Sequence, residues 1–155
     1  MNAAPHFKKI ALIGFGLIGG SIARAARAQG LAGEIVTTAR SARTRARVAE
    51  LGIVDRVVES NAEAVKDADL VILCIPVGAC GPVAQEIARY LKPGAIVSDV
   101  GSVKGAVVRE MAPHLPDGVH FVPAHPVAGT EHSGPDSGFA ELFIKIGRAS
   151  CRERV

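Results

Sequence analysis

Aromatic residues are scarce in this sequence, and their scarcity limits the kind of core that the chain can build. Only 4 % of the 155 residues are aromatic, with no tryptophan and one tyrosine, whereas 48 % are hydrophobic. The core must therefore come from alanine, valine, isoleucine and leucine, a mix typical of α/β proteins with buried strands. The length predicts a single domain.

Cysteine and long apolar runs are scarce as well. Cys74, Cys80 and Cys151 are odd in number and have no C-x-x-C spacing, which argues against a disulfide framework and against a zinc site. We expect Cys74, inside "VILCIPV", to be a small buried hydrophobic residue. No apolar run approaches the roughly 20 residues of a membrane span, and "MNAAPHFKK" contains no apolar signal region, so we expect a cytoplasmic protein.

Net positive charge is absent outside the end of the chain. The net charge is +3, but without residues 145–155, "KIGRASCRERV", the chain has 14 basic and 14 acidic residues. That segment resembles the translated read-through of a common sequencing-library adapter, and we interpret it as a non-native tail; a solvated basic tail is the alternative. We expect no nucleic-acid partner and assign the domain to residues 7–144.

Apolar strand-like segments alternate with helical ones along the whole domain. This alternation predicts a doubly wound α/β fold with a mostly parallel, Rossmann-type sheet, whose ligands bind beyond the carboxyl ends of the strands. The predicted strands lie within 7–16, 33–40, 54–60, 69–77, 95–101 and 118–124, and the predicted helices within 17–30, 41–52, 61–68, 80–94 and 102–115.

Helix boundaries follow from a few residues. Ser41 is expected to cap the second helix at its start, and Gly30 and Gly52 to stop the first and second helices. Pro82 suits the first turn of the fourth helix. Asn61 is expected to begin the third helix.

The segment "IALIGFGLIGGS" contains a G-x-G-x-x-G motif after a predicted strand and before a helix. Gly14 would allow the tight turn, Gly16 would let the backbone approach a pyrophosphate, and Gly19 would let helix and strand pack closely. The helix start offers free N–H groups to the phosphates. We predict a dinucleotide site that includes Gly14, Phe15, Gly16, Leu17, Ile18 and Gly19.

The end of the second predicted strand bears on which dinucleotide binds. An NAD site would place an acidic residue about 20 residues beyond the glycines, but the stretch 38–43 contains no carboxylate. Arg40, Ser41 and Arg43 could hold a 2′-phosphate instead, so we predict NADP, with NAD possible. Arg45 and Arg47 are expected only to solvate the helix.

Two further strand ends should border the dinucleotide. Pro76 would end one strand and turn the backbone outward, so we assign Ile75, Pro76 and Val77 to the cofactor site. Ser102 precedes a helix and is either an N-cap or a site residue, or both. Lys104 is unfavourable for the dipole of that helix, which favours a role in the site.

The loop "HPVAGTEHSG" follows the last predicted strand. A histidine at a carboxyl edge can titrate near neutrality and accept a proton as a hydride leaves, and His125 is our candidate. Pro126 and Gly129 would hold the loop in a defined turn. His132 is a second choice, and the other histidines are given no role.

The motifs "IGFGLIGGSIARA", "DLVILCIPV", "SDVGSVKG" and "HPVAGTEHSGPDSGFAELF", in this order, resemble the nucleotide-binding domain of prephenate and arogenate dehydrogenases over roughly residues 7–143. The resemblance implies NAD(P)-dependent oxidative decarboxylation of prephenate or arogenate in tyrosine biosynthesis. It implies that His125 acts on the ring hydroxyl and that Ser102 lies between hydroxyl and nicotinamide. It places Gly129 and Thr130 against the substrate, with Glu131 a weaker candidate.

In that family the chain continues into a helical domain that supplies dimer contacts and a substrate-binding arginine. Residues 144–155, "IKIGRASCRERV", cannot replace such a domain, so we expect this chain to bind dinucleotide with little or no turnover. The alternatives left open are an NADP-dependent reductase or β-hydroxyacid dehydrogenase with the same nucleotide fold, and a dinucleotide-binding module without chemistry.

Overall fold

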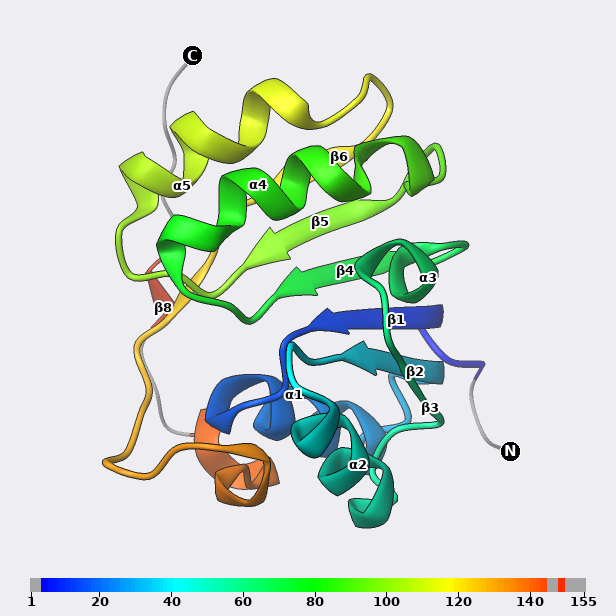
Figure 1. Cartoon of the computed structure of the whole chain (residues 1–155), viewed down its shortest axis with the longest axis vertical. Coiled ribbons are helices and arrows are strands. Elements are labelled where there is room, and N and C mark those ends of the chain that lie inside the picture. The colour runs from blue at the N-terminus through cyan, green and yellow to red at the C-terminus, as the bar shows by residue number, and fades with distance from the viewer. Residues whose placement is uncertain (1–3, 145–147, 150–155) are drawn as a thin grey trace.

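A six-stranded sheet, parallel throughout, forms the centre of the chain (Figure 1). The structure is a computed structural model and describes residues 4–144 and 148–149. The strand order β3-β2-β1-β4-β5-β6 reverses direction between β1 and β4, as in a doubly wound fold. The predicted fold class is confirmed. The strands are β1 (Phe7–Ile13), β2 (Ala32–Thr38), β3 (Arg56–Val58), β4 (Leu70–Leu73), β5 (Ile96–Asp99) and β6 (His120–Val122).

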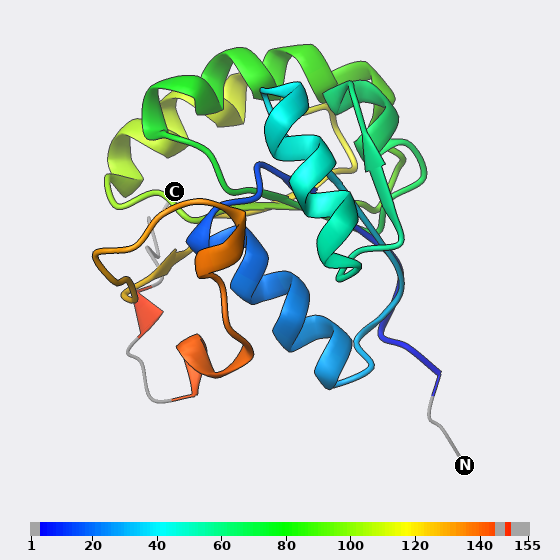
Figure 2. The ribbon, with the colours of Figure 1, turned by 60° about the horizontal axis from the view of Figure 1, so that its bottom comes forward.

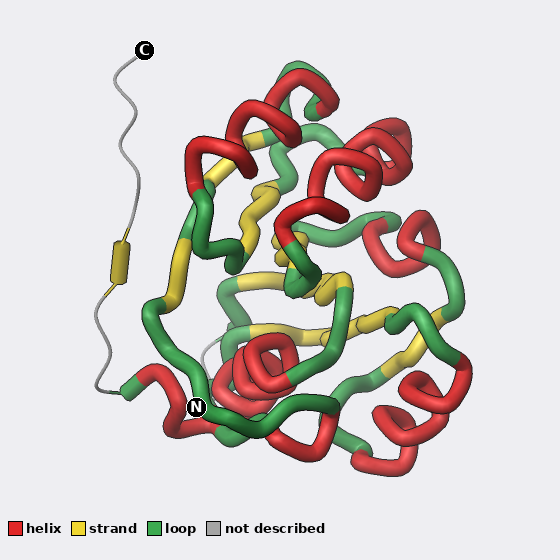
Figure 3. Tube along the Cα trace, turned by 60° about the vertical axis from the view of Figure 1, so that its left-hand side comes forward, coloured by secondary structure: helices red, strands yellow, loops and turns green. Residues whose placement is uncertain are grey.

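Helices cover both faces of the sheet. They are α1 (Leu17–Ala28), α2 (Ala42–Leu51), α3 (Asn61–Val65), α4 (Val77–Ile87) and α5 (Lys104–Met111). Figure 2 shows α4 and α5 on one side of the sheet and α1 on the other, and Figure 3 shows the strands enclosed between helices. None of the helices in the described part of the chain has both the length and the apolar character of a membrane span.

Alternating side chains of the strands fill two separate apolar clusters. Ile10 and Leu12 of β1 pack with α1 and α2, whereas Ala11 and Ile13 of the same strand pack in the cluster that contains α4 and α5. This period of two follows from the pleat of a strand. Because both faces of the second half of β1 are buried, residues 10–13 read as a continuous apolar run.

Four of the predicted helix boundaries hold, among them the start of α3 at Asn61, and one does not. Ser41 accepts a hydrogen bond from the Thr44 N–H, and Gly52 ends α2 with φ of 62°. Gly30 follows α1 with φ of 63°. The prediction for Pro82 is wrong: α4 begins at Val77, so Pro82 lies inside the helix. Pro82 is the sixth residue of α4, so it removes the hydrogen bond that an N–H there would make to the Gly78 carbonyl, while its ring is exposed.

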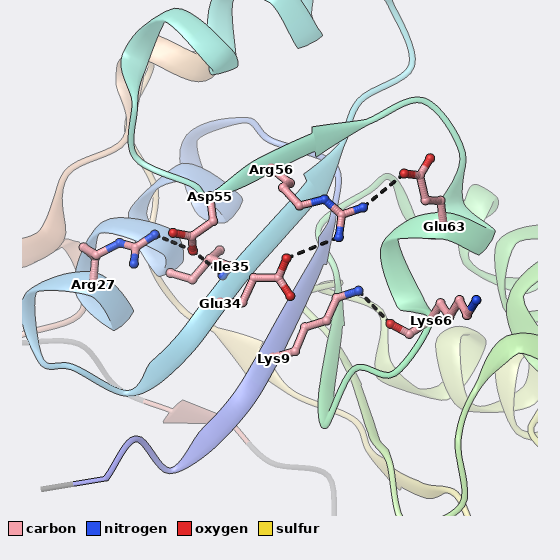
Figure 4. Close-up of polar contacts among 8 residues, drawn as sticks. All are labelled: Lys9, Arg27, Glu34, Ile35, Asp55, Arg56, Glu63 and Lys66. Carbon is pink, nitrogen blue, oxygen red and sulfur yellow. Dashed lines mark hydrogen bonds and ion pairs between the residues drawn. The ribbon is translucent and has the colours of Figure 1, made fainter.

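Polar side chains connect the first three strands to α3 (Figure 4). The Lys9 ammonium donates to the Lys66 carbonyl at 2.6 Å, and Arg56 bridges Glu34 at 3.3 Å and Glu63 at 3.1 Å. Burial lowers the pKa of Lys9, and the neighbouring Glu34 carboxylate partly offsets this effect. These contacts fix α3 against the amino half of the sheet.

A second contact in the same view ties α1 to the segment before β3. Arg27 pairs with Asp55 at 2.7 Å, and the same carboxylate accepts the Ile35 N–H at 2.7 Å (Figure 4). Burial alone would raise the pKa of Asp55, but the hydrogen bond from Ile35 and the Arg27 guanidinium outweigh it and hold the pKa below its ordinary value.

The chain after β6 crosses to the α1 side of the sheet. It forms β7 (His125–Pro126) and two short 3₁₀ helices, Pro135–Ser137 and Ala140–Phe143, that lie against α1 (Figure 2). The Phe139 N–H donates to the buried Ser21 hydroxyl at 3.0 Å. β7 pairs antiparallel with β8 (Arg148–Ala149). Apart from these two residues, the predicted tail lies outside the described residues. Its non-native origin stays a prediction.

Candidate functional site

A cleft of about 760 Å³ lies at the carboxyl ends of β1, β2, β3 and β4. Open α/β sheets bind ligands at this edge, where the strand order reverses. The cleft brings together three of the segments that the sequence singled out: the glycine loop, the start of α2 and the end of β4. Its lining comprises Ile13, Gly14, Phe15, Gly16, Thr38, Ala39, Arg40, Ser41, Thr44, Glu59, Asn61, Cys74, Ile75, Pro76, Ala79 and Val83.

The three glycines of the motif have three different environments. Gly14 has φ of 93°, and a Cβ there would lie 2.5 Å from the Cys74 carbonyl oxygen. A Cβ on Gly19 would lie 2.5 Å from the Gly14 carbonyl oxygen, whereas a Cβ on Gly16 would meet nothing within 4 Å. Gly14 and Gly19 are thus required by the protein's own packing. Gly16 is not, and it leaves open space at the start of α1.

The start of α1 is available to an anion. Gly16 is its N-cap residue, no side chain caps the helix, and the first turn contains no acidic residue. The unpaired N–H groups and the helix dipole favour negative charge at this position. Leu17, Ile18 and Gly19 belong to this first turn but are not among the residues that line the cleft.

Polar groups from the start of α2 form another wall of the cleft. Arg40 and Ser41 are exposed and line it, as does Thr44. The Ser41 hydroxyl also caps α2, since it contacts the Thr44 N–H at 3.0 Å and the Thr44 hydroxyl at 2.8 Å. Arg43 does not line this cleft; it lies in a neighbouring cavity with Arg47.

The expectation that Arg45 and Arg47 only solvate their helix is wrong. Arg45 donates to the Ala39 carbonyl at 2.9 Å, and 19 % of its side chain is exposed. Arg47 contacts both carboxylate oxygens of Asp136, at 2.5 and 3.2 Å. This pairing lowers the pKa of Asp136 and raises that of Arg47. Their partners lie far away in the sequence or on the backbone, where periodicity gives no indication of them.

Sequence reasoning missed an acidic residue in the cleft. Glu59 follows β3 and lines the cleft with Asn61, and its carboxylate lies 3.6 Å from Arg45. The 38–43 stretch contains no carboxylate, but a neighbouring strand end supplies one. The position of Glu59 at the end of a predicted strand was a usable signal, because the carboxyl end of every strand in a parallel sheet reaches the same edge.

The end of β4 forms the wall opposite α2. Ile75 and Pro76 line the cleft as predicted, while Val77 begins α4 and is not among the lining residues. Cys74 is partly rather than fully buried as a residue and also lines the cleft. Burial of its thiol, together with the nearby Asp99 carboxylate, raises the pKa of Cys74 to about 12, so the side chain is a neutral thiol.

His125 lines a second cavity, of about 720 Å³, at the carboxyl ends of β5 and β6. Because β6 is parallel to β5, the residues after β6 lie at the same sheet edge as the glycine loop, as expected. The cavity is bordered by Ser98 and Asp99 of β5 and by Phe143. Within the described part of the chain no hydrogen bond holds the imidazole, so its place depends on the backbone that carries it.

The other predicted substrate residues do not line either cavity. Ser102, Gly129 and Thr130 are exposed. Ser102 is not an N-cap, since α5 begins after Val103 and no side chain caps it. Thr130 accepts the His132 N–H at 3.2 Å and so shapes the loop. His132 itself is exposed and lies 3.4 Å from Glu131.

Asp99 at the end of β5 and Lys104 at the start of α5 form a buried pair, and Asp99 lines the second cavity. Sequence reasoning had given Asp99 no role. Asp99 is fully buried, and 10 % of the Lys104 side chain is exposed. Their ammonium and carboxylate are in direct contact. The proximity of Asp99 explains why Lys104 is tolerated at the start of α5, where the helix dipole disfavours a cation.

Comparison with known proteins identifies the family. Residues 22–146 match the family model described as "Prephenate dehydrogenase, nucleotide-binding domain". The chain belongs to the prephenate dehydrogenase family. The match covers most of the chain, including the Asp99–Lys104 pair and the His125 loop, and begins after the glycine motif.

Relatives of the prephenate dehydrogenase family agree in sequence and in fold. The chain is 48 % identical over 139 residues to the cyclohexadienyl dehydrogenase of Zymomonas mobilis. The aligned region covers 88 % of this chain and 46 % of that protein. It superposes on the Synechocystis arogenate dehydrogenase with a TM-score of 0.81 at 30 % identity, over 90 % of this chain and 48 % of that one.

A third relative is the prephenate dehydrogenase of Aquifex aeolicus, solved in complex with hydroxyphenyl propionate and NAD⁺. The TM-score is 0.79 at 31 % identity, over 88 % of this chain and 47 % of that one. The chain thus spans about half the length of the relatives that it matches.

Proposed function

We propose that this chain is the dinucleotide-binding half of a prephenate or arogenate dehydrogenase, an oxidoreductase of tyrosine biosynthesis that uses NADP or NAD. The observation that carries the proposal is the open space over Gly16, at the uncapped start of α1 and within the cleft of about 760 Å³. The family match and the NAD⁺ complex of the Aquifex relative support it.

The residues of the cleft fit a nicotinamide dinucleotide. The start of α1 would hold the pyrophosphate, because its N–H groups are free and no side chain fills the space above Gly16. Arg40 and Ser41 would hold the adenosine ribose or its 2′-phosphate, and Ile75 and Pro76 would border the dinucleotide on its way towards β5. When bound, the oxidised nicotinamide supplies the hydride acceptor.

His125 and the residues after β5 would then act on the substrate. His125 would accept the proton of the ring hydroxyl as hydride leaves the same ring carbon, and loss of carbon dioxide would aromatise the ring. Ser102 would orient the hydroxyl, and Gly129 with Thr130 would contact the substrate side chain. The half-buried imidazole at the edge of the second cavity supports this assignment. We propose that the chain alone turns over slowly or not at all, at well below about 1 s⁻¹.

We propose a preference for NADP, carried by Arg40. The guanidinium is exposed at the cleft and free to meet a 2′-phosphate, although the Glu59 carboxylate in the same cleft opposes an anion there. Arg40→Ala should weaken NADP binding about tenfold or more, equivalent to about 1.4 kcal/mol, and leave NAD binding within about twofold. Glu59→Gln is the matched control and should strengthen NADP binding.

Isothermal titration of both dinucleotides into the three proteins tests these assignments. Equal loss of NADP and NAD affinity in Arg40→Ala would assign Arg40 to the shared part of the cofactor. No binding of either dinucleotide to the parent chain would overturn the proposed function itself.

A further inference from the structure

Both backbone polar groups of Ala124, the residue before His125, are bound by the Asp99–Lys104 pair. The Ala124 N–H donates to Asp99 Oδ1 at 3.2 Å, and the Ala124 carbonyl accepts from Lys104 Nζ at 2.8 Å. Lys104 also contacts Asp99 Oδ2 directly, and that oxygen accepts the Gly101 N–H at 2.8 Å. One residue thus has both of its backbone groups bound by two side chains that bind each other.

Burial makes this arrangement specific. Asp99 is fully buried, and removing a carboxylate or an ammonium from water costs several kcal/mol unless every charge is paired and hydrogen-bonded. Here both oxygens of the Asp99 carboxylate accept hydrogen bonds, from two N–H groups and the ammonium. Gly101 is tightly packed as well, since a Cβ there would lie 3.0 Å from Asp99, Val77 and Val107 atoms. The turn between β5 and α5 therefore has little freedom to shift.

We propose that Asp99 and Lys104 are positioning residues for His125. They bind the backbone N–H and C=O of Ala124 and thereby fix where the imidazole enters the second cavity. Within the described residues, no side-chain hydrogen bond holds the ring itself. The inference rests on the proposed role of His125. It explains why the pair occurs on the β5–α5 turn, which is the strand end next to β6 in the sheet.

The chain contains a matched control. Asp69, just before β4, contacts Lys92 and accepts the Lys9 N–H at 3.0 Å, so it combines a lysine and a backbone N–H as Asp99 does. Asp69 precedes β4, whereas Asp99 is the last residue of β5. The two carboxylates therefore lie at opposite edges of the parallel sheet. Lys92→Met removes the same kind of contact as Lys104→Met without touching the peptide before His125.

The test is NMR of the isotopically labelled chain. In Lys104→Met, amide exchange of Ala124 should accelerate about tenfold or more beyond any acceleration at the core amide of Leu12 in β1, and the His125 imidazole signals should shift and broaden. Lys92→Met should leave the Ala124 and His125 signals at their parent positions. Equal behaviour of the two variants at Ala124 and His125 would overturn the proposal.

A second variant covers the case in which Lys104→Met does not fold. The double change Asp99→Asn with Lys104→Met leaves no unpaired charge and also lacks the donor to the Ala124 carbonyl, so the same signals should change. Parent-like Ala124 and His125 signals in the double variant would overturn the proposal. Titration of each protein with NADP and with NAD separates this outcome from the proposed function, because a parent chain that binds neither dinucleotide contradicts that function whatever the His125 signals do.

Discussion

Replacing Gly16 separates the requirements of the ligand from those of the fold. A Cβ on Gly16 meets nothing within 4 Å, and φ of −103° is accessible to alanine. The loss of a glycine N-cap costs up to about 1 kcal/mol, which lowers Tm by at most about 4 °C in a chain of this size. The added methyl occupies the space proposed for the pyrophosphate, so Gly16→Ala should weaken NADP binding about tenfold or more, about 1.4 kcal/mol.

Gly14→Ala is the comparison variant and should lower the free energy of unfolding more than Gly16→Ala does. Its φ of 93° is strained for alanine by about 1–3 kcal/mol. Its Cβ would lie 2.5 Å from the Cys74 carbonyl oxygen, which adds an overpacking cost of about 1–3 kcal/mol. The expected loss is at least about 2 kcal/mol, and Tm should fall by about 4 °C or more.

Thermal unfolding and isothermal titration with NADP, carried out on both variants and the parent chain, test the expected changes in stability and in affinity. Parent-like affinity in Gly16→Ala would refute the placement of the pyrophosphate at the start of α1. Parent-like stability in Gly14→Ala would refute the claim that the turn itself requires this glycine.

Three further outcomes follow from charges and burial. The pKa values of Asp55 and Asp69 are depressed, Asp69 chiefly by the hydrogen bond from Lys92; their contribution to stability is present above the unfolded value of about 3.9 and is lost as pH falls through the folded values. Tm should therefore hold to about pH 5 and fall below about pH 4, less steeply in Asp69→Asn; an unchanged slope in that variant would contradict its role. Because the pKa of Cys74 is raised to about 12, its alkylation by iodoacetamide at pH 8 should be at least about 100-fold slower than that of a free thiol of pKa about 8.5, as followed by mass spectrometry; rapid labelling would contradict a neutral thiol. Lys104→Met leaves the buried Asp99 carboxylate unpaired and should cost about 3–5 kcal/mol, against about 1 kcal/mol or less for the more exposed Lys92→Met; equal changes in Tm would argue against the burial of the pair.

The sheet and the glycine loop could be predicted from the sequence because local patterns determine them. Alternating apolar segments indicated the six parallel strands, and the turn at Gly14 and the caps at Ser41 and Gly52 depend on side chains within a few residues. Local signals also misled. Pro82 suits a first turn, yet α4 begins earlier at Val77, next to the strand end.

Contacts between distant segments could not be predicted in this way. Lys104 gave a hint, since a cation at a helix start is unfavourable, but its partner peptide at Ala124 belongs to another strand end. Glu59 reaches the cleft only because β3 lies beside β2. Arg47 meets Asp136 because the chain after β6 returns to the α1 side of the sheet. Such pairings depend on strand order, which periodicity alone does not provide.

The central claim is that this chain binds a nicotinamide dinucleotide in the cleft at the carboxyl ends of β1 to β4. The most direct test is titration of the ¹⁵N-labelled chain with NADP, followed by the amide signals of assigned residues. Saturable shifts should occur at Gly14 and Gly16, at Ser41 and at Ile75, while the amide of Asp69 at the opposite edge of the sheet stays in place. Absence of shifts in the glycine loop with both NADP and NAD at millimolar concentration, or shifts only at Asp69, would contradict the claim.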